Sequence, residues 1–214
     1  MLELGEYFHR YILIDTQKYQ WLIETLTKLN LQIEKIANFG CGEGRETFTL
    51  MCMLKAREGI GVDKNHQSIK NAEGTLETIK QIILAKGVSN DAPDFLKKLY
   101  SEEIVKFYWG NIIEPTPLQS SYDIAFCDHV LYHIWLDQGG QENTQKAIKE
   151  MARVVGASGV VVISEPTKCT GKQTFEIDFK PLFKPAHLKL VYVQIEELEQ
   201  GQVTHYLCLK ESTD

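Results

Sequence analysis

The hydrophobic and polar positions of the chain follow two spacings, which predict helices and strands in alternation. In some stretches apolar side chains recur every three or four residues, as they do along the buried face of an amphipathic helix. These stretches are residues 17–29, 46–58, 66–87 and 141–155. Short apolar runs separate them, and each run has the length of a buried strand. The runs are residues 34–39, 59–63, 104–109, 122–127 and 160–164.

The order of these elements predicts an α/β fold. Strands that alternate with helices pair in parallel through right-handed crossovers, which places helices on both faces of the sheet. The C-terminal part differs, because residues 187–198 and 202–211 are extended runs joined by the short sequence "EQGQ". Such a pair predicts a hairpin that makes the edge of the sheet antiparallel.

Composition limits the possible partners. The 214 residues carry a net charge of −6, which disfavours binding to nucleic acid phosphates or to an anionic membrane surface. No apolar run approaches the roughly 20 residues that cross a bilayer, and the first residues do not resemble a signal peptide. The five cysteines show no metal-binding spacing, so we expect free thiols in a reducing cytoplasm.

The stretch "NFGCGEG", residues 38–44, carries the candidate chemistry. Three glycines in five residues, directly after a strand and before a helix, allow a ligand to approach the main chain closely, although a tight turn without a ligand also needs glycine. The next strand ends on Asp63, which favours the ligand interpretation. The spacing differs from G-x-G-x-x-G, since Arg45 stands where the third glycine belongs, and no G-K-[ST] follows. A nicotinamide or flavin dinucleotide is therefore disfavoured, as is a P-loop nucleotide.

At this point the chain resembles the class I S-adenosylmethionine-dependent methyltransferases, from about residue 34 to residue 209. Besides the glycine motif and Asp63, the matching segments are "YWGNI" at 108–112, "YDIAFCDHVLYHI" at 122–134 and "ARVVGASGVVVIS" at 152–164. The resemblance implies a Rossmann-like three-layer αβα sandwich, with a mostly parallel seven-stranded sheet and an antiparallel C-terminal hairpin strand. It also implies S-adenosylmethionine as the cofactor.

The resemblance assigns the donor-binding residues. The glycines would shape the pocket, Asp63 would accept the ribose hydroxyls, and the pair at 111–112 would meet the adenine. The full set of expected donor-binding residues is Asn38, Gly40, Cys41, Gly42, Gly44, Asp63, Lys64, Asn111, Ile112 and Asp128. The family usually has an acid where this chain has Asn38 and Asn111. These two amides either weaken donor binding or serve only local backbone groups.

The segment after the fourth strand, "CDHVLYHIW", borders the acceptor in the family. His133 is the first candidate for a general base, and Asp128 and His129 are the second candidates. A packing role for His133 is an equal alternative. No metal is expected, because Glu165 is the only obvious further ligand and a hard cation prefers several oxygens.

The expected organisation is a single methyltransferase domain over residues 1–214. Residues 1–30 would form a helical cap or lid whose aromatics either cover the donor or join the core, and residues 88–103 would insert a short helix. The expected activity is methyl transfer to a small-molecule oxygen or nitrogen acceptor, by a cytoplasmic monomer or homodimer that binds neither nucleic acid nor membrane. The alternatives are a non-catalytic module that binds the donor or its product, and a protein methyltransferase.

Overall fold

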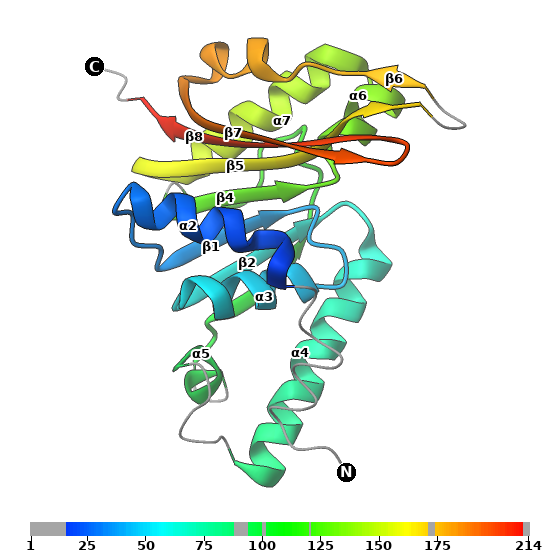
Figure 1. Cartoon of the computed structure of the whole chain (residues 1–214). Helices are drawn as coiled ribbons and strands as arrows, with labels where there is room; N and C mark the ends of the chain where they lie inside the picture. Colours follow the sequence, from blue (N-terminus) through cyan, green and yellow to red (C-terminus); the bar gives the residue numbers. More distant parts are fainter. Residues whose placement is uncertain (1–15, 88–93, 100–101, 120, 171–173, 212–214) are drawn as a thin grey trace. The chain divides into compact units, whose positions relative to one another are not determined.

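The computed structural model describes residues 16–87, 94–99, 102–119, 121–170 and 174–211. The chain forms two compact units, Met1–Gly110 and Asn111–Asp214, and each contains hydrogen-bonded strands with helices packed against them (Figure 1). Residues 1–15 of the expected cap or lid at 1–30 lie outside the described residues, as do parts of the expected insertion at 88–103.

The first unit alternates helices and strands as the sequence predicts. Its elements in chain order are η2 (Thr16–Tyr19), α2 (Gln20–Lys28), β1 (Lys35–Phe39), α3 (Arg45–Leu54), β2 (Glu58–Asp63), α4 (His66–Lys86), α5 (Asp94–Lys98) and β3 (Val105–Trp109).

The three strands of this unit are parallel and lie in the order β3-β2-β1. In this register Phe39 pairs with Val62, and Asp63 pairs with Trp109. The carboxyl ends of the three strands therefore meet at one edge, which is where open α/β sheets bind ligands. Helix α3 packs against β1 and β2, and α4 packs against β2 and β3.

Helix α3 is shorter than predicted. It ends at Leu54, not near residue 58, because Lys55 takes the left-handed conformation with φ of 55°. The Ala56 N–H then donates to the Met51 carbonyl, and the Glu58 N–H donates to the Glu34 carbonyl. Glu58 thus begins β2. The apolar spacing continued past the helix end, so the sequence alone did not locate this turn.

The second unit carries the C-terminal hairpin. Its elements are β4 (Tyr122–Asp128), α6 (Leu131–Asp137), α7 (Gly140–Val154), β5 (Val155–Cys169), β6 (Phe175–Glu176), η3 (Lys180–Leu182), η4 (Lys184–Ala186), β7 (Leu188–Leu198) and β8 (Gly201–Lys210).

The strand order in this unit is β4-β5-β8-β7. Strands β4 and β5 are parallel, whereas β8 is antiparallel to both β5 and β7. This confirms the mostly parallel α/β fold with an antiparallel hairpin. Strand β5 is longer than the predicted residues 160–164, because Pro166 to Cys169 continue to pair with β8 and with the two-residue strand β6.

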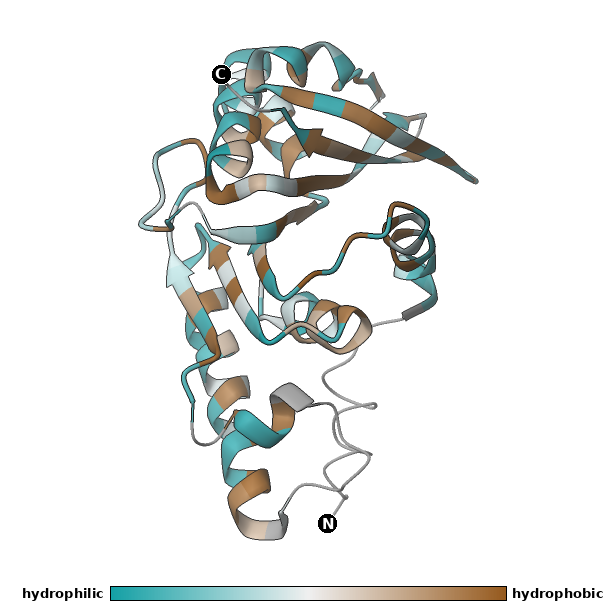
Figure 2. Cartoon of the chain, turned by 90° about the vertical axis from the view of Figure 1, so that its left-hand side faces the viewer, coloured by the Kyte–Doolittle hydropathy of each residue, from teal (hydrophilic) through white to brown (hydrophobic). Residues whose placement is uncertain are grey.

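Apolar positions recur along the strands of both units and on one side of the helices (Figure 2). In β4 and β5 the central positions are fully buried, and the same holds for the apolar face of α7. Sheets covered on both faces read as continuous apolar runs, which explains why these strands were predictable.

The buried Glu150 carboxylate, paired with the exposed Arg153, fixes the loop before β4 to α7. Glu150 Oε1 accepts hydrogen bonds from the Thr116 N–H at 2.7 Å and from its hydroxyl at 2.6 Å. Arg153 donates to both oxygens of Glu150, and its Nη2 also donates to the Leu118 carbonyl. Burial acts to raise the pKa of Glu150, but the Arg153 and Thr116 hydrogen bonds outweigh it and lower the pKa below its ordinary value.

We expect Glu150→Ala to lower the free energy of unfolding by about 2–3 kcal/mol at pH 7, because it leaves the Thr116 N–H and the Arg153 guanidinium without their shared acceptor. The pKa of Glu150 is lowered on folding, so its contribution is complete above the ordinary carboxyl pKa and is lost as the pH falls through the folded value. Urea unfolding at pH 7 measures the loss. Glu142→Ala, which removes an exposed carboxylate paired with Lys146 on the same helix, is the control and should cost less than about 0.5 kcal/mol. Equal losses in the two variants would contradict the assignment.

Candidate functional site

The turn between β1 and α3 is built from three glycines with positive φ. The φ values are 72° at Gly40, 52° at Gly42 and 82° at Gly44. Residues with a side chain rarely adopt positive φ, which explains why the sequence has glycine at these three positions. The N–H groups of Gly40 and Cys41 both donate to the Val62 carbonyl, so the turn is attached to the end of β2.

The glycines differ in what surrounds them. A Cβ at Gly44 would lie 2.6 Å from the Phe107 ring, so this glycine is required for packing against β3. A Cβ at Gly42 would meet no described atom within 4 Å. Gly42 therefore faces open space, and its left-handed backbone is the part of the turn that a ligand can approach most closely.

Asp63, the last residue of β2, holds the same turn. Its Oδ2 accepts the Gly42 N–H at 2.9 Å, and its Oδ1 accepts the Asn65 N–H at 2.7 Å. Each carboxylate oxygen has about two acceptor positions, so the group can still accept two further protons. The side chain is half-buried. The carboxylate thus orients the glycine turn and remains available to a diol.

Trp109 lies beside Asp63 in the pairing register and was not singled out by its sequence position. Its indole Nε1 donates to the Lys64 carbonyl at 3.0 Å, which fixes the ring at the start of the β2–α4 connection. The ring nevertheless stays 64% exposed. Asn65 caps α4, since its Oδ1 accepts the N–H groups of Gln67 and Ser68.

Two of the expected donor-binding residues of this unit lie in the interior. Asn38 is fully buried, and its Nδ2 donates to the Thr47 hydroxyl at 3.1 Å. Its Oδ1 has no hydrogen-bond partner among the described residues. Cys41 is also buried, and burial, together with the charges of Asp63 and Glu46, raises the pKa of its thiol. The Cys41 side chain therefore stays a neutral thiol.

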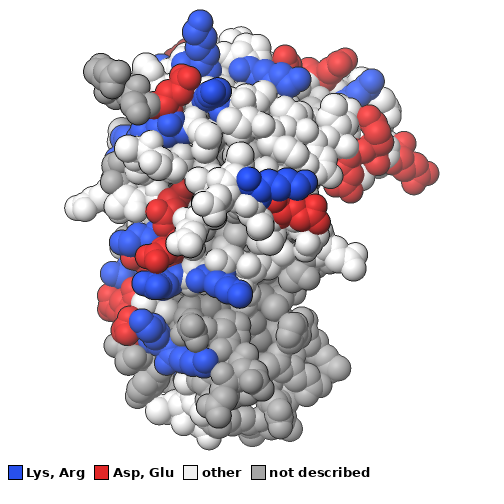
Figure 3. All heavy atoms as spheres, turned by 60° about the vertical axis from the view of Figure 1, so that its left-hand side comes forward, with Lys and Arg blue, Asp and Glu red and all other residues white. Residues whose placement is uncertain are grey.

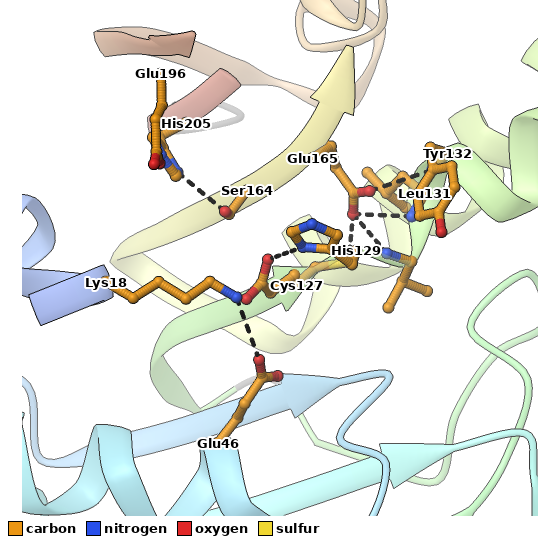
Figure 4. A network of polar contacts seen from close by, with 12 residues as sticks. Lys18, Glu46, Cys127, His129, Leu131, Tyr132, Ser164, Glu165, Glu196 and His205 are labelled. Atoms are coloured by element: carbon orange, nitrogen blue, oxygen red, sulfur yellow. Dashed lines mark hydrogen bonds and ion pairs between the residues drawn. The ribbon is translucent and has the colours of Figure 1, made fainter. Parts of the chain in front are cut away.

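The N-terminal helix is joined to the helix that follows the glycine turn. The Tyr19 hydroxyl donates to Glu46 Oε1 at 2.8 Å, and the Lys18 ammonium lies 3.9 Å from the same oxygen (Figure 4). Tyr19 and Trp21 are buried, so these two aromatics of the expected lid belong to the core.

The second unit holds the remaining expected residues. Asn111 accepts the Ile113 N–H on its Oδ1 at 3.4 Å, and Ile112 is buried. At the end of β4, the buried carboxylate of Asp128 lies 2.5 Å from Nδ1 of His129. The His129 side chain is 42% exposed, and its backbone is left-handed with φ of 57°. A left-handed histidine held by a buried carboxylate is the kind of constrained arrangement found at functional sites.

Strand β5 holds the backbone that follows Asp128 through two adjacent residues. The Ser164 carbonyl accepts the His129 N–H at 2.9 Å. The buried Glu165 carboxylate accepts the next three N–H groups: those of Val130 at 2.9 Å, Leu131 at 2.9 Å and Tyr132 at 3.3 Å (Figure 4). Four consecutive donors are thus satisfied from β5, and α6 begins at a fixed position. The sequence marked Glu165 only as a weak metal-ligand candidate.

Burial raises the pKa of Glu165 to about 7, although the three N–H donors and His129 act in the opposite direction. Its neighbour Ser164 is held in turn, because the Ser164 hydroxyl lies 2.9 Å from His205 Nδ1 and Glu196 lies 3.5 Å from His205 Nε2. The Glu165 carboxylate is thus directed at the start of α6.

His133, the first candidate for a base, lies one turn into α6. Its Nδ1 is 3.6 Å from Asp137, and both side chains are more than half exposed. Its ring centroid is 3.9 Å from that of Tyr132. The structure therefore gives His129, not His133, a buried carboxylate partner.

Comparisons with known proteins identify the family and the fold of the chain. The model of a family described as a methyltransferase domain matches residues 34–207. None of the curated proteins matches the sequence. A crystal structure of a S-adenosylmethionine-dependent methyltransferase from Clostridium acetobutylicum is similar over 97% of this chain and 98% of that chain, with a TM-score of 0.65 and 12% identity.

Two further solved structures share the fold. The methyltransferase domain of bacterial CtHen1-C is 15% identical, with a TM-score of 0.64 over 92% of this chain and 99% of that chain. Magnesium protoporphyrin IX methyltransferase from Synechocystis, solved with S-adenosylmethionine bound, is 12% identical, with a TM-score of 0.60 over 92% of this chain and 79% of that chain. Among the helices that the structure describes, none has the length and apolar character needed to cross a membrane.

The raised pKa of Glu165 predicts a pH-dependent stability difference. An acid whose pKa is about 7 when folded and 4.5 in its ordinary state binds more protons in the folded state between these values. Its contribution to the free energy of unfolding therefore falls as the pH rises from about 4.5 to about 7. We expect Glu165→Gln to become more stable relative to the wild type as the pH is raised from 5 to 8, measured by urea unfolding.

Glu176→Gln is the control for the loss of one negative charge, because it removes an exposed carboxylate from the same unit. A stability difference between Glu165→Gln and the wild type that stays constant across this pH range would contradict the assignment.

Proposed function

Since the chain belongs to the methyltransferase domain family, we propose that it transfers the methyl group of S-adenosylmethionine to an oxygen or nitrogen atom of a small molecule. The observation that carries the proposal is the left-handed Gly42, which faces open space and is hydrogen-bonded to a carboxylate with unused acceptor positions.

The donor fits the chemistry of this turn. S-adenosylmethionine has no phosphate, so it needs no lysine cradle, but it has a ribose diol and a long amino acid chain. We assign the diol to Asp63, because a charged acceptor binds hydroxyl protons more strongly than a neutral one. The amino acid part would lie along Gly40 and Gly42. The hydrogen bond between Gly42 and Asp63 would fix both contacts before the donor arrives, which lowers the entropy cost of binding.

The other expected donor contacts are proposed from their positions along the chain. Asn111 and Ile112 follow β3 and remain the proposed adenine contacts, and Lys64, which follows Asp63, remains a proposed donor contact. Asn38 and Cys41 are buried, so in this proposal they support the turn from behind and do not touch the donor. Gly44 is proposed to act through its packing on Phe107.

On the acceptor side we assign general-base catalysis to Asp128 and His129. A carboxylate on Nδ1 selects the tautomer with a proton on that nitrogen and leaves Nε2 as the base. In the proposed reaction the acceptor loses its proton to His129 Nε2 while its lone pair forms the new bond to the methyl carbon. The carbon–sulfur bond breaks, its electron pair returns to sulfur, and S-adenosylhomocysteine leaves as a neutral thioether. This assignment places His129 ahead of His133.

The proposal includes a cytoplasmic location, since all five cysteines are free thiols. It also includes an acceptor that is neither nucleic acid nor a membrane lipid. In support, Lys and Arg side chains lie among Asp and Glu side chains on the face in view (Figure 3). The whole chain has a net charge of −6. A monomer or homodimer remains the proposed assembly.

We expect Gly42→Val to lower the affinity for S-adenosylhomocysteine at least 100-fold, because the side chain would occupy the open space that the donor needs. Isothermal titration calorimetry measures the affinity. Gly87→Val is a matched control, because Gly87 also has positive φ, 75°, and also faces open space, but it lies at the end of α4. Both variants carry the same kind of backbone strain, of order 1–3 kcal/mol, yet only Gly42→Val should lose binding. Unchanged affinity in Gly42→Val would overturn the assignment of the turn.

The tautomer of His129 tests the acceptor-side assignment without an acceptor. Two-bond ¹H–¹⁵N spectra of the neutral side chain should show the proton on Nδ1, whereas Asp128→Ala should shift the population toward Nε2–H because the acceptor on Nδ1 is gone. The His133 signals should be the same in both proteins. A wild-type His129 protonated mainly on Nε2, or one unaffected by Asp128→Ala, would exclude the proposed base.

A further inference from the structure

Four aromatic side chains gather where α6 begins, and we call them the aromatic cluster: His129, Tyr132, His133 and Phe175. Tyr132 and Phe175 are close to parallel, with ring centroids 6.1 Å apart and an interplanar angle of 21°. The His129 ring meets Tyr132 edge to face at 6.3 Å, and the His133 ring lies against Tyr132 at 3.9 Å.

The cluster is at the surface and is not part of the core. Tyr132 and Phe175 are half-buried, and the two imidazoles are exposed. The core aromatics of this unit pack separately, since Trp135 contacts Phe179, and Phe179 contacts Tyr206. The cluster is therefore partly open to solvent directly beside the proposed base.

Hydrogen bonds hold the backbone beneath the cluster in place, because β5 accepts the four N–H groups from His129 to Tyr132. Tyr132 and His129 are thus fixed relative to each other. Phe175 lies in β6, which pairs with the end of β5. Strand β5 therefore holds both segments that supply the cluster, the start of α6 and β6. A backbone fixed in this way lowers the entropy cost of binding a flat ligand.

The acid–base chemistry of the cluster further limits the chemical class of the methyl acceptor. An imidazole base works best on a group whose pKa is not far above that of imidazolium. Phenols have a pKa near 10, which is much closer to the pKa of imidazolium than the pKa of an alkanol is. Asp128 is engaged by His129, and Glu165 by the start of α6, so neither carboxylate is directed outward to bind a cationic amine. Asp137 pairs with His133, and the exposed Glu176 follows Phe175 in β6.

We propose that the acceptor is a planar aromatic molecule with an acidic hydroxyl or ring N–H, whose ring stacks on Tyr132 and Phe175 while its proton goes to His129. This inference rests on the proposed function and names the substrate class of that site. The hydroxyl or ring N–H proton passes to Nε2, the electron pair on that oxygen or nitrogen forms the bond to the methyl carbon, and the carbon–sulfur bond of the donor breaks with its electron pair returning to sulfur. The products are the methylated aromatic compound and S-adenosylhomocysteine, and His129 later releases its proton to water.

Tyr132 does not compete as a base or as an acceptor in this arrangement. Burial, with the nearby charges of Glu165 and Asp137, raises the pKa of its phenol. The side chain therefore stays neutral and contributes its ring face.

The test uses matched pairs of aromatic and saturated compounds. Binding of 1-naphthol and 8-hydroxyquinoline is measured by calorimetry in the presence of S-adenosylhomocysteine, and methylated products are measured by mass spectrometry with S-adenosylmethionine. The controls are decahydro-1-naphthol, which has a similar shape without a ring system, and decahydroquinoline, a cation. We expect the aromatic compounds to bind at least tenfold more tightly than the saturated ones, and only the aromatic compounds to be methylated.

Variants of Phe175 separate stacking from packing. Phe175→Leu keeps an apolar side chain, and it should raise Kd and KM for the aromatic compounds about three- to tenfold with little change in kcat. Phe175→Tyr should restore both values. Tyr192→Leu, which removes a half-buried ring from β7, should change neither.

Tighter binding of the saturated compounds, methylation of the amine in preference to the aromatic compounds, or an unaltered Kd in Phe175→Leu would each overturn the inference. So would a protein that binds S-adenosylhomocysteine but none of the aromatic compounds. Failure to bind S-adenosylhomocysteine itself would instead contradict the proposed function.

Discussion

The hydrogen bond from the Gly42 N–H to the Asp63 carboxylate is the interaction on which the candidate donor site depends. It joins the turn after β1 to the last residue of β2, so the two parts of the sequence that carry the chemistry, 21 positions apart, act as one surface. The same carboxylate accepts the Asn65 N–H, and Asn65 in turn caps α4. The charge at the end of β2 therefore sets both the shape of the turn and the start of the following helix.

A comparable constraint operates in the second unit, where β5 fixes the backbone after β4. Glu165 reaches the start of α6 from another strand, and three N–H donors surround its carboxylate. Burying an acid in this way is costly, as its raised pKa shows. The cost is understandable if the left-handed His129 must be held in one orientation. A strained backbone conformation persists only where the surrounding structure holds it in place.

The sequence predicted the strands and the glycine turn well, because these features depend on local patterns. Buried parallel strands appear as uninterrupted apolar runs, and residues that need positive φ appear as glycines. The sequence did not predict the features that depend on contacts between residues far apart in the chain or on an unusual backbone conformation. The end of α3 depends on a left-handed Lys55, and the length of β5 depends on pairing with β6 and β8. The role of Glu165 depends on backbone groups more than 30 positions away, and the ring of Trp109 is placed by the Lys64 carbonyl. The sequence also favoured His133 over His129, because only the structure shows which histidine Asp128 contacts.

The central claim is that a sulfonium nucleoside lies on the Gly42 turn with its sugar at Asp63. The most direct measurement is a ¹H–¹⁵N NMR titration of the whole protein with S-adenosylhomocysteine. The account predicts that the amide signals of Gly42 and Asn65 shift most strongly, because both N–H groups bond to the carboxylate that would receive the ribose hydroxyls. Saturable binding that leaves these two signals in place and shifts residues elsewhere would contradict it.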